Sequence, residues 1–150
     1  MLLVIKKSQI AYFYAFILMV FALAQLFTFD EFLQSINSLG AHIEPIVSNL
    51  LGVLIVVSEV FALPFLIDMK LSTPVRAIGR VFGVLAPLIW LKLSLWSVLT
   101  GITVKNLGIL GDKFQLAPGW WAVALSIFLL AMAIWINFET NWLPRKTHNK

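Results

Sequence analysis

The sequence predicts an all-α fold: a transmembrane four-helix bundle with its N- and C-termini in the cytoplasm. Apolar residues make up 61% of the 150 residues and charged residues only 12%, which is far more apolar than a soluble domain. The apolar residues are also gathered into long runs instead of alternating with polar ones, as in chains that cross a bilayer. We expect residues 1–150 to form a single integral membrane domain.

Four runs have the length that a spanning helix needs, about 20 residues for a hydrocarbon core of roughly 30 Å. The predicted spans cover residues 8–29, 46–67, 81–101 and 118–138. The first separator contains acids, Gly40 and Pro45, and the second contains Pro74 and three basic residues. The third separator is rich in glycine and ends at Pro118, a residue well suited to the first turn of a helix.

The distribution of charge predicts the orientation, because cytoplasmic loops collect Lys and Arg. With the N-terminus inside, the inner side receives eight basic residues and two acids, and the outer side receives two basic residues and four acids. Tryptophans support the boundaries of the fourth span, since Trp120 and Trp121 lie at its start and Trp135 and Trp142 lie near its end. Tryptophan is enriched at membrane interfaces. Both termini are therefore expected in the cytoplasm.

The N-terminal run also has an alternative interpretation as a secretory signal. It has a basic start and a small-x-small site at Ala22 to Ala24, so cleavage would leave a chain that starts at Gln25 and has three spans. The apolar run is longer than the usual signal core of about 7 to 15 residues. The length of this apolar run therefore favours a first transmembrane span over a cleaved signal.

Several classes of chemistry are excluded by composition. The chain contains no cysteine, so it offers no disulfide, thiol nucleophile or thiolate ligand. The two histidines, His42 and His148, fall on opposite sides of the membrane in the predicted topology, so we expect no metal site. No catalytic triad or phosphate-binding loop can be assembled, and the basic clusters beside apolar spans fit lipid and topology better than nucleic acid.

Glu59 and Lys92 are the two ionisable residues well inside the predicted spans, where charge is costly unless it is paired or functional. Counted from the inner ends of their spans, they lie at depths of ~12 Å and ~16 Å. An ion pair between neighbouring helices is therefore expected. The pair could fix helix register, Lys92 could face a partner subunit, or the pair could handle protons or bind a headgroup.

Two prolines and a tryptophan could form a pocket together with Glu59 and Lys92. Pro64 and Pro87 are expected to kink spans two and three, and Trp96 lies on span three. A proline frees a carbonyl that a neighbour or a ligand must satisfy, and apolar pockets with a few polar groups are common ligand sites. The other polar residues of the spans are expected to form interhelical hydrogen bonds; they are Gln25, Asn49, Ser94, Ser97 and Asn137.

Three segments resemble the DoxX and MauE-like membrane proteins. "ALAQLFTFDEFLQSI" is similar to the segment after the first helix of that family, with Gln25 where a Lys is usual, followed by Leu26 and by an acid, Asp30 or Glu31, with Phe32. Pro45 matches the proline before the second helix. "VVSEVFALPFLI" resembles the second-helix pattern, in which a Glu precedes an apolar run, and Glu59 falls on that Glu.

The third match is "LGILG", residues 107–111, which resembles a Cys-Gly-Cys-Phe-Gly motif between the third and fourth helices of MauE-like proteins. Gly108 and Gly111 keep the glycine spacing, whereas Leu107 and Ile109 replace the cysteines. One member of this family is associated with maturation of a disulfide-rich periplasmic enzyme, and some relatives are associated with thiol- or quinone-linked redox chemistry. Without the thiols, disulfide exchange at this loop is impossible. Its apolar residues, Ile109 and Leu110 among them, and the adjacent Asp112 are expected to cap the bundle or to dock on a partner.

The resemblance and the residues together lead to two functional hypotheses. The first is a non-enzymatic accessory or assembly subunit of a membrane or membrane-attached redox complex in a bacterial or archaeal cell membrane. Its partners would be lipid and other membrane or extracytoplasmic proteins. The second is a quinone- or lipid-binding protein, with an intramembrane pocket between spans two and three bounded by Glu59, Lys92, Pro64, Pro87 and Trp96.

Overall fold

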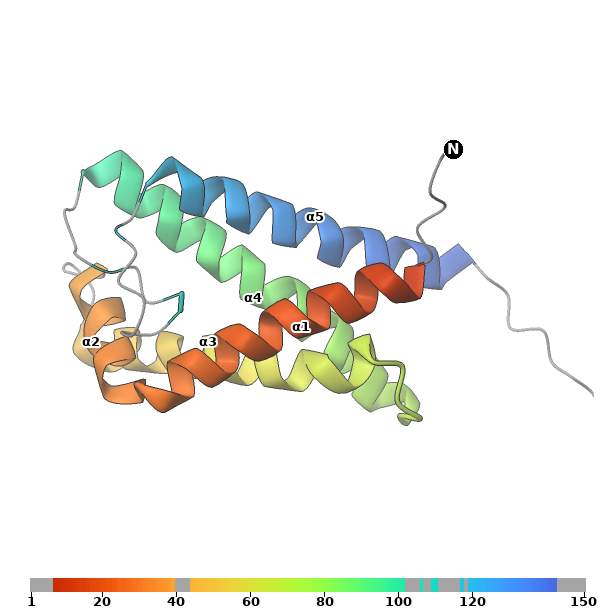
Figure 1. Cartoon of the computed structure of the whole chain (residues 1–150). Coiled ribbons are helices and arrows are strands. Elements are labelled where there is room, and N and C mark those ends of the chain that lie inside the picture. Colours follow the sequence, from red (N-terminus) through yellow and green to blue (C-terminus); the bar gives the residue numbers. More distant parts are fainter. Residues whose placement is uncertain are drawn as a thin grey trace, which may run out of the picture.

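The computed structural model describes residues 7–39, 44–101, 106, 109–110, 117 and 119–142. The described residues form five helices, which are α1 (Lys7–Phe27), α2 (Phe29–Leu39), α3 (Pro45–Leu66), α4 (Thr73–Thr100) and α5 (Trp120–Trp142). The four long helices run alongside one another, and α2 lies at one end of them (Figure 1). We call this the α2 end.

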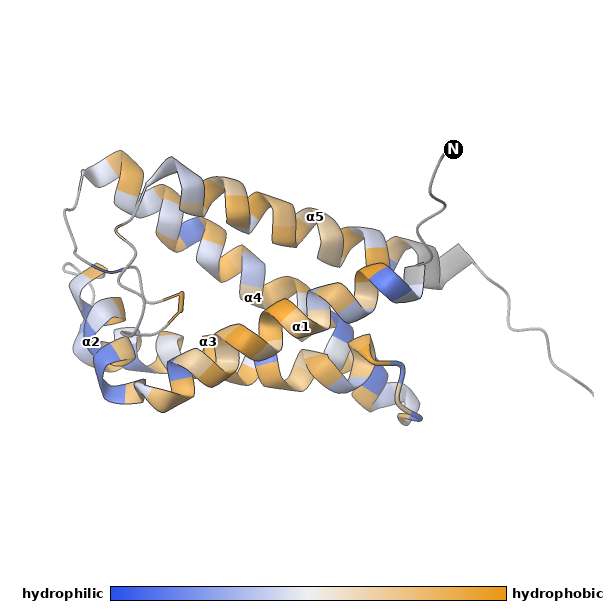
Figure 2. Ribbon diagram, in the orientation of Figure 1, coloured by the Kyte–Doolittle hydropathy of each residue, from blue (hydrophilic) through white to orange (hydrophobic). Residues whose placement is uncertain are grey.

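Four of the helices are long and apolar enough to cross a membrane: Ser8–Phe27, Pro45–Leu66, Thr73–Thr100 and Trp120–Phe138. For the described residues, the prediction of an all-α fold with four apolar helices of spanning length is confirmed. Large apolar side chains are exposed on every one of these helices, Phe16, Leu50, Leu99 and Phe128 among them. Figure 2 shows hydrophobic residues along the long helices, and hydrophilic residues on α2 and at the turn between α3 and α4. Such surfaces are stable when lipid covers them.

The long helices pack in a closed order, because α1 contacts α3 and α5, and α4 contacts the same two helices. Glycines allow α4 to approach α3 closely, which is a common device between membrane helices. A Cβ atom added at Gly79 would lie 2.7 Å from Phe65 Cβ, whereas one added at Gly83 would lie 3.7 Å from Ala62 Cβ. Of these two glycines, Gly79 is therefore the one with no room for a side chain against α3.

α4 begins earlier than its expected start at residue 81. Its first residue is Thr73, with Pro74 directly after it, and it ends before Gly101, whose φ is +64°. Proline stabilises a first turn, and a glycine in the left-handed region is a common helix end. The apolar run therefore marks only part of this helix, which includes the polar turns that carry Arg76 and Arg80.

The segment after α1, expected to be a loop, contains the amphipathic helix α2. Asp30 and Glu31 lie in its first turn, where the helix dipole favours acids. Phe32, Ile36 and Leu39 form its buried face, at the spacing of one helical stripe. α2 packs on α3 at Gly52, where an added Cβ would lie 2.6 Å from Leu33 and 3.4 Å from Phe32. The helix thus covers the bundle at the α2 end.

Candidate functional site

Buried polar side chains surround Glu59 on α3. The Glu59 side chain is fully buried. Its Oε1 accepts a hydrogen bond from Trp90 Nε1 of α4 at 3.0 Å and a longer one from Gln25 Nε2 of α1 at 3.4 Å. Three helices therefore meet at one carboxyl group through neutral donors.

Gln25 extends this contact to the segment between α4 and α5. Its Nε2 also donates to the backbone carbonyl of Ile109 at 3.1 Å, which is possible because a carboxamide nitrogen carries two hydrogens. We call Gln25, Glu59, Trp90 and the Ile109 carbonyl the Glu59 cluster. The three segments on which the family resemblance rests thus each contribute a residue to one cluster.

The segment with the glycine-spaced motif is held inward at Ile109. The Ile109 side chain is only 2% exposed and packs in the core, and Leu110 is partly buried beside it. Ile109 therefore caps the bundle instead of presenting its side chain to a partner. Leu107, Gly108, Gly111 and Asp112, the other residues expected in a docking loop, lie outside the described residues.

α2 covers the cluster from the α2 end. The ring of Phe32 lies 6.3 Å from the ring of Trp90, centroid to centroid and tilted by 54°, within the range of favourable aromatic pairs. Phe32 is fully buried and Trp90 is 1% exposed. The bond from Trp90 to Glu59 is therefore shielded from solvent by a helix that lies where the sequence predicts a loop.

Glu59 and Lys92 do not form the expected ion pair, because Lys92 is exposed while Glu59 is buried among Gln25 and Trp90. The expected depths were compatible, but depth does not fix the direction of a side chain around the helix. Trp90 faces Glu59, and Lys92 follows two residues later, roughly 200° further around the axis. Lys92 therefore points away from the cluster, on the outer surface of α4.

The residues expected around one pocket are also separated. Pro87 is buried, Pro64 is partly buried and Trp96 is 47% exposed on the same outer side as Lys92. The carbonyl that Pro87 frees is satisfied by a neighbour: Gly83, four residues earlier, accepts a 2.6 Å hydrogen bond from the hydroxyl of Tyr14 on α1. A proline in a helix removes the N–H that would bond this carbonyl.

Several buried side-chain oxygen atoms of α1, α3 and α4 have no hydrogen-bond partner within the described part of the chain. They are Glu59 Oε2, Gln25 Oε1, Ser94 Oγ and Ser97 Oγ. Ser94 and Ser97 lie four and seven residues after Trp90, hence on the same stripe of α4. Buried polar atoms without partners are costly. The arrangement can therefore accept a donor from a ligand or water.

Sequence reasoning selected Glu59 and noted Gln25, but it missed Trp90 and Tyr14. Trp90 was missed because tryptophans in a membrane chain are most often interface anchors. For Tyr14, a phenolic hydroxyl inside an apolar run was a usable signal, because such a group needs an acceptor. No group of three or more His, Asp or Glu side chains within the described ranges could hold a metal ion. Comparisons with protein-family models, curated proteins and solved structures found no match.

Proposed function

We propose that this chain is an accessory or assembly subunit of a membrane or membrane-attached redox complex, without thiol chemistry of its own. It forms a transmembrane four-helix bundle in a bacterial or archaeal cell membrane, with both termini in the cytoplasm and the α2 end outside. The resemblance to DoxX and MauE-like proteins is the ground for the redox complex. The exposed Lys92 on an apolar helix face is the observation that carries the subunit role.

Lys92 lies within a continuous exposed stripe on α4. The stripe, which we call the α4 outer face, consists of Leu88, Lys92, Leu95, Trp96 and Leu99, at the spacing of one side of a helix. A lysine facing lipid deep in the bilayer costs roughly 2.5 to 3.5 kcal/mol on insertion scales. A transmembrane helix of a partner with an acidic or amide group at the same depth would remove that cost.

The α4 outer face also has the composition of a contact surface. Trp96 is 47% exposed and Leu99 is 71% exposed beside the lysine. Tryptophan is enriched among residues that dominate binding energy, and polar contacts between membrane helices contribute about 1 to 2 kcal/mol in model peptides. The partner we propose is therefore a membrane protein that offers an acceptor to Lys92 and an apolar groove to Trp96.

The test is purification of the tagged full chain in gentle detergent, followed by native mass measurement. We expect the wild type to retain a partner in fixed ratio and Lys92→Met to lose it. Lys70→Met is the matched control, because Lys70 is exposed in the turn before α4 and the same charge is removed. A monomer without co-purifying protein would contradict the proposal, and so would equal retention by Lys92→Met, as expected if Lys92 only reaches lipid headgroups.

A quinone or a lipid bound beside the Glu59 cluster is the second candidate function. The unpartnered Glu59 Oε2 and Gln25 Oε1 favour it, because a ligand hydroxyl or a bridging water could donate to them. Mass spectrometry of extracts from purified protein should then show a quinone or polyisoprenoid near one per chain, reduced in Glu59→Leu. Only bulk lipid in both samples would exclude this function.

A further inference from the structure

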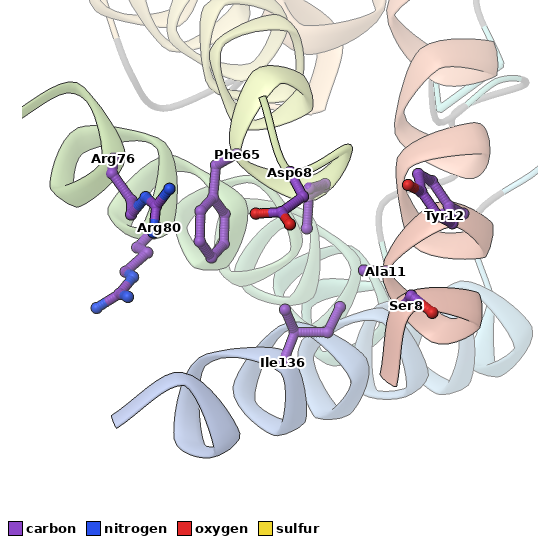
Figure 3. Close-up of a pocket in the computed structure, with 9 residues that line it drawn as sticks. Ser8, Ala11, Tyr12, Phe65, Asp68, Arg76, Arg80 and Ile136 are labelled. Atoms are coloured by element: carbon purple, nitrogen blue, oxygen red, sulfur yellow. The ribbon is translucent and has the colours of Figure 1, made fainter. Parts of the chain in front are cut away.

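We propose that a phosphate group binds the cavity at the end of the molecule opposite α2, and that an anionic phospholipid supplies it. The cavity has a volume of about 300 Å³ and is bounded by α1, α5, the C-terminal end of α3 and the first turns of α4. Its polar lining consists of Ser8, Tyr12, Asp68, Arg76 and Arg80 (Figure 3). We call it the arginine cavity. It is distinct from the Glu59 cluster.

The two arginines come from one face of α4. Arg76 and Arg80 are four residues apart, so their side chains are neighbours on the helix surface. The Arg80 guanidinium lies 5.6 Å from the centre of the Phe65 ring, a cation–π distance that limits its movement. The Phe65 Cβ lies close to Gly79. Close packing of α3 on α4 therefore positions one of the two cationic groups.

The depth of the cavity matches the level of lipid phosphates. α4 contains 28 residues, or about 42 Å of helix, whereas the hydrocarbon core is about 30 Å thick. Arg76 and Arg80 lie before residue 81, where the apolar run of this helix begins. These arginines are thus in the part of α4 that extends into the headgroup region.

The charges and apolar walls of the cavity fit an amphiphile. Two arginines and one carboxylate, that of Asp68, line the cavity, and the oxygens of a phosphodiester accept charge-assisted hydrogen bonds from arginine. Asp68 can accept hydrogen bonds from a hydroxylated headgroup such as glycerol. Ala11, Leu66 and Ile136 supply apolar surface in the same cavity. Phosphatidylglycerol satisfies all of these groups, while phosphatidylcholine offers Asp68 no donor.

The experiment is native mass spectrometry of the detergent-purified full chain with phosphatidylglycerol or phosphatidylcholine of the same acyl chains. We expect the wild type to retain phosphatidylglycerol preferentially. The double variant Arg76→Gln, Arg80→Gln should bind it at least about tenfold more weakly, a change of about 1.4 kcal/mol. Lys70→Gln, which removes a cation at the same end but outside the cavity, should bind as the wild type does.

A second pair of variants does not touch the arginines. Ser8 and Gln9 are adjacent exposed residues of α1, and Ser8 lines the cavity. Ser8→Glu should weaken phosphatidylglycerol binding by repulsion, whereas Gln9→Glu, with the same net charge, should not. Equal binding by all variants, or equal losses in Ser8→Glu and Gln9→Glu, would overturn the proposal.

A competition arm distinguishes the two sources of phosphate. If a phospholipid is the ligand, millimolar inorganic phosphate should leave retention of phosphatidylglycerol unchanged. Displacement by inorganic phosphate in the wild type would overturn the assignment to lipid and show that the arginine cavity binds free phosphate.

Discussion

The bond between Tyr14 and Gly83 gives a prediction whose magnitude follows from the helix geometry. Pro87 has no N–H, so the Gly83 carbonyl four residues earlier relies on the Tyr14 hydroxyl, at 2.6 Å. Tyr14→Phe removes that donor. We expect it to lower the free energy of unfolding by about 1 to 3 kcal/mol, the usual cost of an unsatisfied buried polar group.

The same change should cost less in the Pro87→Ala background, because the backbone N–H that alanine restores can then bond the Gly83 carbonyl. Only the interhelical bond is lost in that background, worth about 0.6 kcal/mol on average in membrane proteins. The double-mutant cycle should therefore give a coupling of about 1 kcal/mol between positions 14 and 87. Tyr12→Phe serves as the control, since Tyr12 is 54% exposed on the same helix.

The assay is reversible unfolding in mixed detergent micelles with rising dodecyl sulfate, followed by circular dichroism. A Tyr14→Phe cost that is equal in the wild-type and Pro87→Ala backgrounds would refute the reasoning. A cost equal to that of Tyr12→Phe would do the same, because the hydroxyl would then contribute nothing specific.

Three further predictions concern packing and the Glu59 cluster. Gly79→Ala should lower the free energy of unfolding by about 1 to 3 kcal/mol, because the new Cβ would lie 2.7 Å from Phe65 Cβ. Gly83→Ala should be nearly neutral in the same unfolding assay, because its new Cβ would lie 3.7 Å from Ala62 Cβ. Equal effects of the two substitutions would contradict the argument that α3 and α4 are in close contact at Gly79. Glu59→Leu should lower the free energy of unfolding by about 1 to 3 kcal/mol, because it leaves the Trp90 and Gln25 donors unsatisfied. Glu59→Gln keeps an acceptor and should lower the free energy of unfolding clearly less. The reverse order would show that these hydrogen bonds do not stabilise the fold. Lys92→Met should leave the stability of the isolated protein within about 0.5 kcal/mol of wild type, since Lys92 is exposed, and a large loss would reinstate a buried role for this lysine.

The apolar runs were sufficient to predict the four spans but not their full extents. α1 and α3 agree with the expected spans within about two residues, a typical uncertainty for helix ends. α4 starts well before its expected position because Pro74, Arg76 and Arg80 look like loop residues when only hydropathy is considered. The stripe of Phe32, Ile36 and Leu39 could have revealed α2, although its acids and its short length made a loop the simpler interpretation.

The sequence predicted the depth of Glu59 and Lys92 along their helices, but not the direction in which their side chains point around the helix axes. Glu59 stood out because an acid inside an apolar run is rare. Its partner could not be chosen, since a helix that is apolar on most sides carries little periodic signal about its rotation. Trp90 and Lys92 are close in sequence, yet only Trp90 faces Glu59. The bond from Gln25 to Ile109 spans 84 residues, and no local pattern indicates such a contact.

The order of contacts in the Glu59 cluster has a consequence for how the protein enters the membrane during synthesis. The chain is made from its N-terminus, so Gln25 precedes Glu59, and Glu59 precedes Trp90. Glu59 is therefore made after Gln25, one of its two donors, and Trp90 is made after Glu59, its acceptor. Ile109 comes last and engages the second hydrogen of Gln25. Each new segment can thus form a hydrogen bond with a polar group that was synthesised earlier. This order shortens the time that an unsatisfied carboxyl or amide spends in contact with lipid.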